Sequence, residues 1–230
     1  MTSILKRTAA ALLATTAVAA IASTAQAQDF KGVQGGDIVV RARGLAVLPQ
    51  EKGTVNAAGL GSIGSASIKN DYIPELDVTY FVTPNIGLNL IAGTSRHSVA
   101  VDLNPGAAGL LGTTTVDAGK VSLLPPTLTA TFHPLPNSRI NPYVGAGINW
   151  TLFYNEKNGP GLANTKYKNA FGWALQAGAD IYLTDNLLLN FDVKKVWLDT
   201  KMSTYLGPTR VSTSVDINPW LVGVGIGYKF

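Results

Sequence analysis

The last fifteen residues, Asp216 to Phe230, read DINPWLVGVGIGYKF and decide the fold. From Trp220 onward every second residue is large and apolar, and most of the residues between them are glycines. A period of two is typical of a β-strand. Because glycines add almost nothing to a packed interior, the pattern favours a strand with lipid on one face and a cavity on the other. Aromatic residues at both limits, Trp220 at one and Tyr228 with Phe230 at the other, suit the two interfaces of a bilayer.

The N-terminus predicts export. Lys6 and Arg7 precede a short apolar run that ends in an A-x-A cleavage pattern at residues 25–27. This arrangement is typical of a secretory signal peptide, so residues 1–27 are predicted to be removed and residues 28–230 to form one mature domain. A membrane anchor is the alternative, but the run is short for a span and no stop-transfer charges follow it.

The composition limits the class of protein. Cysteine is absent, which excludes disulfides and thiolate metal sites, and no metal-ligand spacing, phosphate loop or nucleotide fingerprint is present, so no cofactor or metal is expected. Removal of the signal peptide takes two of the 18 basic residues and none of the 14 acidic ones. No polybasic tract remains, so nucleic acid is not an expected partner. No later apolar run is long enough for a transmembrane helix, and a membrane location therefore requires strands.

The period of two recurs in eight segments, and the connections between them alternate between short and long. The predicted strands are residues 37–48, 71–82, 86–97, 120–133, 141–154, 170–183, 187–200 and 216–230. The long connections, predicted as loops, are residues 49–70, 98–119, 155–169 and 201–209. This alternation is typical of outer-membrane barrels. The sequence thus predicts an all-β fold for residues 28–230, an eight-stranded antiparallel transmembrane β-barrel with short periplasmic turns and long extracellular loops.

Alternation along the strands places a set of charges on the inner face of the barrel. The predicted inward charges are Arg41, Arg43, Glu75, Asp77, Asp180, Asp192, Lys194 and Lys229. Pairing of the first hairpin brings Arg43 near Asp77. Because an unpaired buried charge is costly, the favoured interpretation is an ion-pair network that fills the waist of the barrel. The alternative is that these charges gate the channel or select a solute.

Two further features concern the wall and its chemistry. Pro125 and Pro126 lack N–H groups, so strand pairing is predicted to be interrupted there, which makes them the candidate opening in the wall. Ser95 and His97 share one face, and with Glu75 they supply the groups of a catalytic triad. Residues two apart on one inward strand face have weak geometry for attack on a lipid, so the protein is predicted not to be an enzyme.

Four motifs, taken in order, resemble a known family. They are LPPTL at residues 124–128, NPYVGAGIN at 141–149, the stretch 185–195 with its DVKK, and NPW at 218–220 ahead of the terminal GIGYKF. Together they resemble the outer-membrane protein W (OmpW) family of Gram-negative bacteria over essentially the whole mature chain. The resemblance implies a narrow, largely apolar channel, which small hydrophobic solutes enter from outside and leave sideways through a gap in the wall. It also implies that Tyr228 and Phe230 form the terminal signal read by barrel-assembly machinery.

The resemblance extends to individual channel positions. The family's apolar constriction matches Ile91 and Lys194; Ile91 keeps the apolar character, and Lys194 departs from it. The residues expected to line the channel are Ile91, Lys194, Arg41, Arg43, Asp77 and Asp192. The expected function is passive uptake of small hydrophobic molecules across the outer membrane, with outer-membrane lipid as the surrounding partner. The alternative is a non-transporting barrel that acts as a receptor, adhesin or stress-related component through its extracellular loops.

Overall fold

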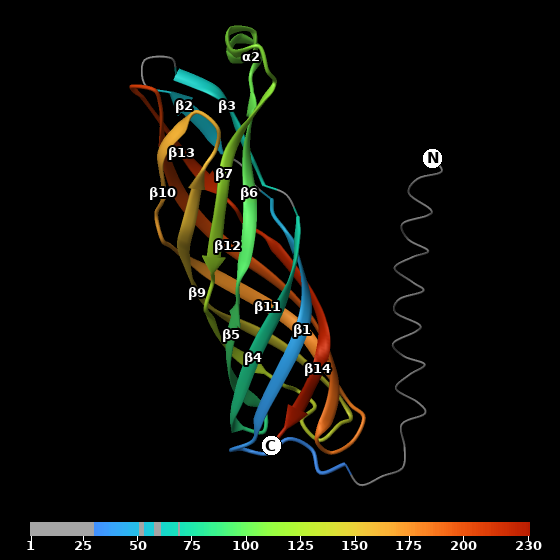
Figure 1. Cartoon of the computed structure of the whole chain (residues 1–230). Coiled ribbons are helices and arrows are strands. Elements are labelled where there is room, and N and C mark those ends of the chain that lie inside the picture. The colour runs from blue at the N-terminus through green and yellow to red at the C-terminus, as the bar shows by residue number, and fades with distance from the viewer. Residues whose placement is uncertain (1–29, 51–52, 58–60, 69) are drawn as a thin grey trace, which may run out of the picture.

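The computed structural model describes residues 30–50, 53–57, 61–68 and 70–230, and the predicted signal peptide, residues 1–27, lies outside them. The described chain forms one tall antiparallel barrel with a single short helix, α2 (Pro105–Leu111), at its top (Figure 1). No helix within these ranges is both long and apolar enough to cross a membrane. The antiparallel pairing of the strands in one sheet confirms the predicted all-β antiparallel barrel.

The predicted count of eight strands is not confirmed, because the described residues form fourteen. Their bounds are β1 (Ile38–Leu48), β2 (Thr54–Ala57), β3 (Gly61–Ile68), β4 (Asp71–Thr83), β5 (Ile86–Gly93), β6 (Ser95–Leu103), β7 (Thr115–Leu124), β8 (Thr127–Phe132), β9 (Ile140–Asn158), β10 (Leu162–Tyr167), β11 (Ala170–Tyr182), β12 (Leu187–Leu206), β13 (Thr209–Asp216) and β14 (Trp220–Lys229).

Eight of these strands close a ring in the lower part of the barrel. Around the ring, β1, β4, β5, β8, β9, β11, β12 and β14 each pair with the next, and β14 pairs with β1. Closure leaves none of these strands with an open edge. The short connections β4–β5, β8–β9 and β11–β12 lie at one end with the C-terminus; we call this the turn end, and the opposite end the loop end (Figure 1).

The predicted loops at the loop end are largely strands, which corrects the sequence reading. Residues 49–70, where described, contain β2 and β3; residues 98–119 contain most of β6, helix α2 and the start of β7. Residues 155–169 contain the end of β9 and β10, and β12 continues through most of residues 201–209. These segments carry the barrel wall upward in the order β10-β12-β13-β2-β3-β6-β7-β9. Gly, Ala and Ser in residues 49–70, Gly, Ala and Thr in residues 98–119 and the polarity of residues 155–169 indicated loops. However, backbone groups next to an existing ladder gain hydrogen bonds by extending it.

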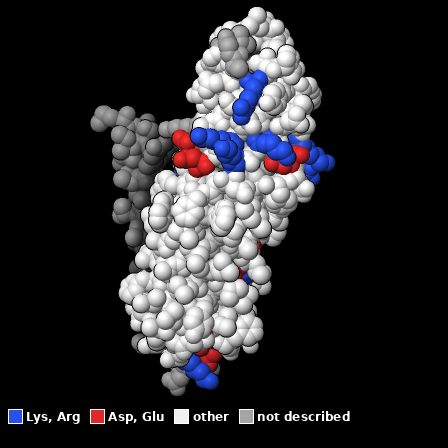
Figure 2. All heavy atoms as spheres, turned by 90° about the vertical axis from the view of Figure 1, so that its left-hand side faces the viewer, with Lys and Arg blue, Asp and Glu red and all other residues white. Residues whose placement is uncertain are grey.

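The outer wall of the ring carries an apolar belt bordered by aromatic rows. Near the loop end, Trp173 pairs with Trp197 and Phe171 with Trp150 on neighbouring strands. On β14, the outward residues that follow Trp220 are exposed and apolar: Val222, Val224 and Ile226. Figure 2, which faces another side of the barrel, shows its lower wall as a broad area almost free of charged side chains. Toward the turn end, Tyr80, Phe132 and Tyr228 are exposed and form the second row. Such a belt between two aromatic rows is typical of a surface that faces lipid.

The closing stretch, residues 216–230, belongs to two strands rather than one. β13 ends at Asp216 and β14 begins at Trp220. Asn218 has a positive φ of 36°, and Pro219 has no N–H, so the ladder cannot run through this link.

The glycines of β14 do not leave open space on the inner face, which corrects a second expectation. A Cβ atom on Gly225 would lie 2.7 Å from Cγ of Arg43, and one on Gly227 would lie 2.8 Å from Cγ of Arg41. The stems of the two arginines occupy the room that the missing side chains provide. A Cβ atom on Gly225 would also clash with the Ala42 carbonyl oxygen, so both the arginine stems and the backbone of β1 exclude a side chain there.

Candidate functional site

Seven charged side chains, each at most 6% exposed, meet inside the ring, and we call them the charged plug: Arg41, Arg43, Glu75, Asp77, Asp180, Asp192 and Lys194. Arg41 Nη1 lies 2.9 Å from Asp77 Oδ1, and Arg41 Nη2 lies 2.6 Å from Asp180 Oδ2. Lys194 Nζ lies 2.8 Å from Asp192 Oδ1 and 3.0 Å from Glu75 Oε1. Every charge in the plug therefore has at least one opposite partner, as a buried ionic group requires.

Strand register explains how the plug assembles. Arg41 faces Asp77 and Arg43 faces Glu75 directly across the β1–β4 pair. Arg43 also forms an ion pair with Asp77, the proximity expected from the first hairpin. Tyr143 on β9 donates its hydroxyl hydrogen to Asp192 at 2.8 Å, which satisfies an acceptor that the cations leave open. Side chains from opposite walls thus meet across the centre and close the barrel toward the turn end.

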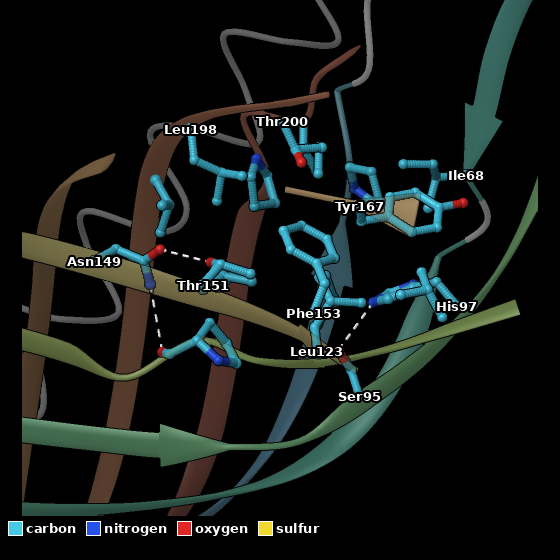
Figure 3. Close-up of a pocket in the computed structure, with 18 of the residues that line it drawn as sticks. Ile68, Ser95, His97, Leu123, Asn149, Thr151, Phe153, Tyr167, Leu198 and Thr200 are labelled. Carbon is cyan, nitrogen blue, oxygen red and sulfur yellow. Dashed lines mark hydrogen bonds between the residues drawn. The ribbon is translucent and has the colours of Figure 1, made fainter. Parts of the chain in front are cut away.

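A largely apolar cavity lies above the plug on the side of the loop end (Figure 3). Its volume is about 1140 Å³, including the space open to solvent at its mouth. The walls are mostly aliphatic and aromatic, with residues such as Val55, Ile68, Val121, Leu123, Phe153, Val196, Leu198 and Met202. Glu75 and Lys194 form its floor, because they line the cavity and are also members of the plug. A cavity of this size and lining suits a small apolar ligand.

The structure divides the six residues expected to line the channel into two groups. Ile91 and Lys194 line the cavity. Arg41, Arg43, Asp77 and Asp192 are not among its lining residues and lie in the plug beneath it. Alternation predicted that all six point inward, but it carries no information on depth along the barrel axis. Depth depends on the register between strands.

The wall is interrupted beside Pro125 and Pro126. The β5–β8 ladder ends at the pair Ile91 and Thr127, and the β6–β7 ladder starts at the pair Ser95 and Leu123. Residues 92–94 and 124–126 therefore face one another outside both ladders, and we call this place the wall break.

The wall break is one-sided and opens on the cavity. On its other flank the Trp150 N–H donates to the Pro126 carbonyl oxygen at 3.0 Å, which keeps β9 attached. Gly93 lines the cavity at the break and contributes no side chain, and Pro125 lines it as well. On the outer side the hydroxyls of Thr94 and Tyr154 lie 2.6 Å apart, and their hydrogen bond bridges the outside of β7 near the break.

The Ser95–His97 pair lies on the cavity wall. Ser95 Oγ lies 3.0 Å from His97 Nε2, and both residues are buried (Figure 3). Glu75, the carboxylate of the hypothetical triad, instead accepts hydrogen bonds from Arg43 and Lys194 at the cavity floor. The absence of enzymatic activity stays a prediction.

Tyr167 is a cavity residue that the sequence reading missed, because residues 155–169 were predicted to be a loop. Its ring stacks on Phe153 with 5.6 Å between the centroids. Its hydroxyl is buried and has no hydrogen-bond partner among the described residues. Burial raises the pKa of the Tyr167 hydroxyl, so the group stays a neutral donor. The alternation of inward Thr165 and Tyr167 in β10 was the available signal for a strand here.

The predicted assembly signal lies at the turn end of the ring. Tyr228 and Phe230 are exposed, and their rings meet edge to face with 4.8 Å between centroids. They therefore extend the turn-side aromatic row at the accessible end of the chain. Recognition by assembly machinery stays a prediction.

Comparison with known proteins places the chain in a family. A family model described as OmpW family matches residues 34–230. The chain is 40% identical over 195 residues to the outer-membrane protein y4mB of Sinorhizobium fredii, which covers 83% of this chain and 79% of that protein. It is 34% identical over 207 residues to outer membrane protein W of Escherichia coli, with 86% of this chain and 90% of that one covered.

The fold comparison agrees with the sequence comparison. The crystal structure of the outer membrane protein OprG from Pseudomonas aeruginosa superposes with a TM-score of 0.79 at 30% sequence identity, covering 88% of this chain and 99% of that chain. The apolar belt, the aromatic rows and the closed ring described above are the features expected of such a protein. The chain therefore belongs to the OmpW family and is an outer-membrane β-barrel protein.

Proposed function

We propose that the protein is an outer-membrane channel for the passive uptake of small hydrophobic molecules, which enter the cavity from the loop end and leave sideways into the membrane at the wall break. The observation that carries the proposal is the combination of an apolar cavity, a floor closed by ion pairs and a side wall whose ladder is interrupted at Gly93 and Pro125.

The charged plug argues against a straight path along the barrel axis. An apolar solute moving toward the turn end would have to separate ion pairs such as Lys194–Asp192 and Arg41–Asp180. Breaking a buried pair costs about 3–5 kcal/mol, and an apolar solute offers the freed charges no compensating hydrogen bonds. The axial route is therefore unfavourable for this class of solute.

The wall break offers a route without that cost. An apolar molecule that moves from the cavity into lipid exchanges one apolar environment for another. At the break it meets Gly93 and Pro125, which present no polar side chain. On the outside, the solute must break the Thr94–Tyr154 hydrogen bond or pass beside it. One hydrogen bond of this kind contributes about 1 kcal/mol, so it is a small barrier.

The test uses the mature protein in liposomes and measures the entry of an apolar fluorescent probe, with empty liposomes as the background. Gly93→Trp should reduce the protein-dependent rate at least about tenfold, because the ring would fill the break while the nearest heavy atom to an added Cβ lies 3.4 Å away. Gly109→Trp on α2, where no heavy atom lies within 4 Å, is the matched control and should keep the wild-type rate. A wild-type rate equal to background, or an unchanged rate in Gly93→Trp, refutes the proposal.

A second candidate function rests on the tip of the β6–β7 hairpin. Helix α2 rises above the rest of the barrel, and none of its residues is buried (Figure 1). Leu110 is 81% exposed and Leu111 is 50% exposed. An exposed apolar tip suits contact with a partner protein, as the receptor or adhesin alternative requires. Under this alternative, Leu110→Ser with Leu111→Ser should abolish attachment of bacteria that display the protein, while probe uptake in liposomes stays at background.

A further inference from the structure

A basic hollow lies on the outer wall of the barrel at the loop end. Four cations, Lys166, Lys168, Lys201 and Arg210, line it together with serines of β12 and β13. Its empty volume is about 880 Å³, including the space open to solvent. We call this set of residues the basic hollow. Its cations point outward, whereas the charges of the plug point inward. Met202 and Thr213 belong to the wall between the two spaces and line both the hollow and the cavity.

Strand register explains why the surface is hollowed there. Lys201 faces Ser214, and Ser203 faces Ser212, across the β12–β13 pair. The three serines have short side chains and lie in adjacent rows, while long cationic side chains stand around them. The result is a shallow floor lined with hydroxyl donors and bordered by ammonium and guanidinium groups. This donor set suits an anion with several acceptor oxygens.

The cations of the hollow are weakly neutralised by the protein itself. No carboxylate is among the residues that line the hollow. Lys166 lies 3.9 Å from Glu156, and 74% of its side chain is exposed, so this pair contributes little. Among the described residues, Lys168, Lys201 and Arg210 form no ion pair within 4.0 Å. Positive charge is therefore available to a partner outside the chain.

The height of the hollow relative to the membrane identifies the partner. On the outward face of β12, Lys201 lies four residues beyond Trp197 of the aromatic row. At about 3.3 Å per residue this is ~13 Å along the strand, or roughly 10 Å along the membrane normal for a strand tilted by about 40°. Figure 2 shows basic side chains, with acidic ones among them, gathered in a band across the molecule above a lower wall with few charges. This places Lys201 at the outer edge of the lipid head groups, which extend ~5–8 Å beyond the hydrocarbon core on each side.

We propose that the basic hollow binds the phosphate groups of the phosphorylated glycolipid in the outer leaflet around the barrel. Phosphate oxygens would accept hydrogen bonds from Lys168, Lys201 and Arg210, and the serine hydroxyls would bond the adjoining sugar. This inference is independent of the proposed solute channel, because it involves only the outer wall.

Two carboxylates set the lower limit of the site. Asp199 and Asp216 are cross-strand partners in the row between Trp197 and Lys201. Their negative charges repel a phosphate and so restrict it to the rows of Lys201 and beyond. The phosphate of the glycolipid is therefore held away from the apolar belt, while its acyl chains lie against that belt.

The test measures binding of a fluorescent bisphosphorylated lipid A to the purified mature protein in zwitterionic detergent micelles. Lys168→Ser with Lys201→Ser should weaken binding about 30-fold at low salt, given the contribution of each lysine near a lipid phosphate. The matched control is Lys120→Ser with Lys157→Ser, a cross-strand pair of exposed lysines on β7 and β9 that removes the same two charges. The control should bind within about twofold of wild type. Both variants must show the heat-dependent gel mobility of a folded barrel.

Further arms identify the source of the phosphate. Dephosphorylated lipid A should bind at least about tenfold more weakly than the bisphosphorylated form, and inorganic phosphate or phosphatidylglycerol at equal charge should compete poorly. Equal loss of binding in the two double variants would show only a general effect of net charge and would overturn the proposal. Equal affinity for phosphorylated and dephosphorylated lipid A, or efficient competition by inorganic phosphate or phosphatidylglycerol, would overturn it as well.

Discussion

Replacement of Lys194 by methionine tests the charged plug. The Lys194 side chain is 1% exposed, and its ammonium group pairs with two carboxylates, Glu75 at 3.0 Å and Asp192 at 2.8 Å. Methionine keeps the volume and apolar character of the stem but removes the charge. The plug then holds four carboxylates against two arginines. Arg43 remains 2.8 Å from Glu75 but 3.6 Å from Asp192, so Asp192 loses its best cationic partner.

The expected loss of unfolding free energy follows from these contacts. Removal of one partner of a buried ion pair costs about 3–5 kcal/mol. Because Asp192 still accepts from Tyr143 and Glu75 keeps Arg43, we expect the lower end, about 3 kcal/mol at neutral pH. Asp192→Asn in the same chain removes the unpaired charge and should restore about 2 kcal/mol, which a double-mutant cycle resolves as a coupling energy.

The measurement is urea unfolding of the protein from lipid vesicles, followed by tryptophan fluorescence, for the wild type, both single variants and the double variant. The difference between Lys194→Met and wild type should shrink in strong acid, where Asp192, left without its lysine partner, takes up a proton. Equal stability of Lys194→Met and wild type at neutral pH, or strictly additive effects in the cycle, would show that Lys194 is not paired in the plug.

Four other changes test separate parts of the molecule. Tyr154→Phe removes the hydrogen bond to Thr94 and should speed release of the apolar probe severalfold; a slower rate would contradict its placement outside the break. Tyr167→Phe removes a buried hydroxyl without a described partner and should raise the urea midpoint, or leave it unchanged, whereas a clear loss of stability would reveal an unseen bond. His97→Ala and wild type should both release no fatty acid from phospholipid or lipid A, and activity in the wild type alone would establish an enzyme. Phe230→Ala should lower the amount of protein in the outer-membrane fraction, and unchanged amounts would remove the assembly role.

Local sequence patterns predicted the lower wall of the barrel but not its upper strands. The strands of the ring were predictable because lipid on one face selects large apolar residues at a period of two, and that selection operates residue by residue. The aromatic rows and the interruption at Pro125 were readable for the same reason, since ring chemistry and a missing N–H act locally. The upper strands were not predicted because small and polar residues, such as Gly, Ser and Ala in β3 and Ser and Thr in β13, carry no such signal. Their state depends on hydrogen bonds to neighbours far away in the chain.

The sequence by itself determined the membrane class, the family and the inward face of each ring strand. Tertiary structure alone decided that Arg41, Arg43, Asp77 and Asp192 close the barrel while Ile91 lines the cavity above them. Parity assigns a side chain to a face, whereas its depth and its partners follow from the register between strands that closure of the barrel imposes. Because of the same register, the arginine stems lie beside the β14 glycines, and the cations of the basic hollow lie close together on the outer wall.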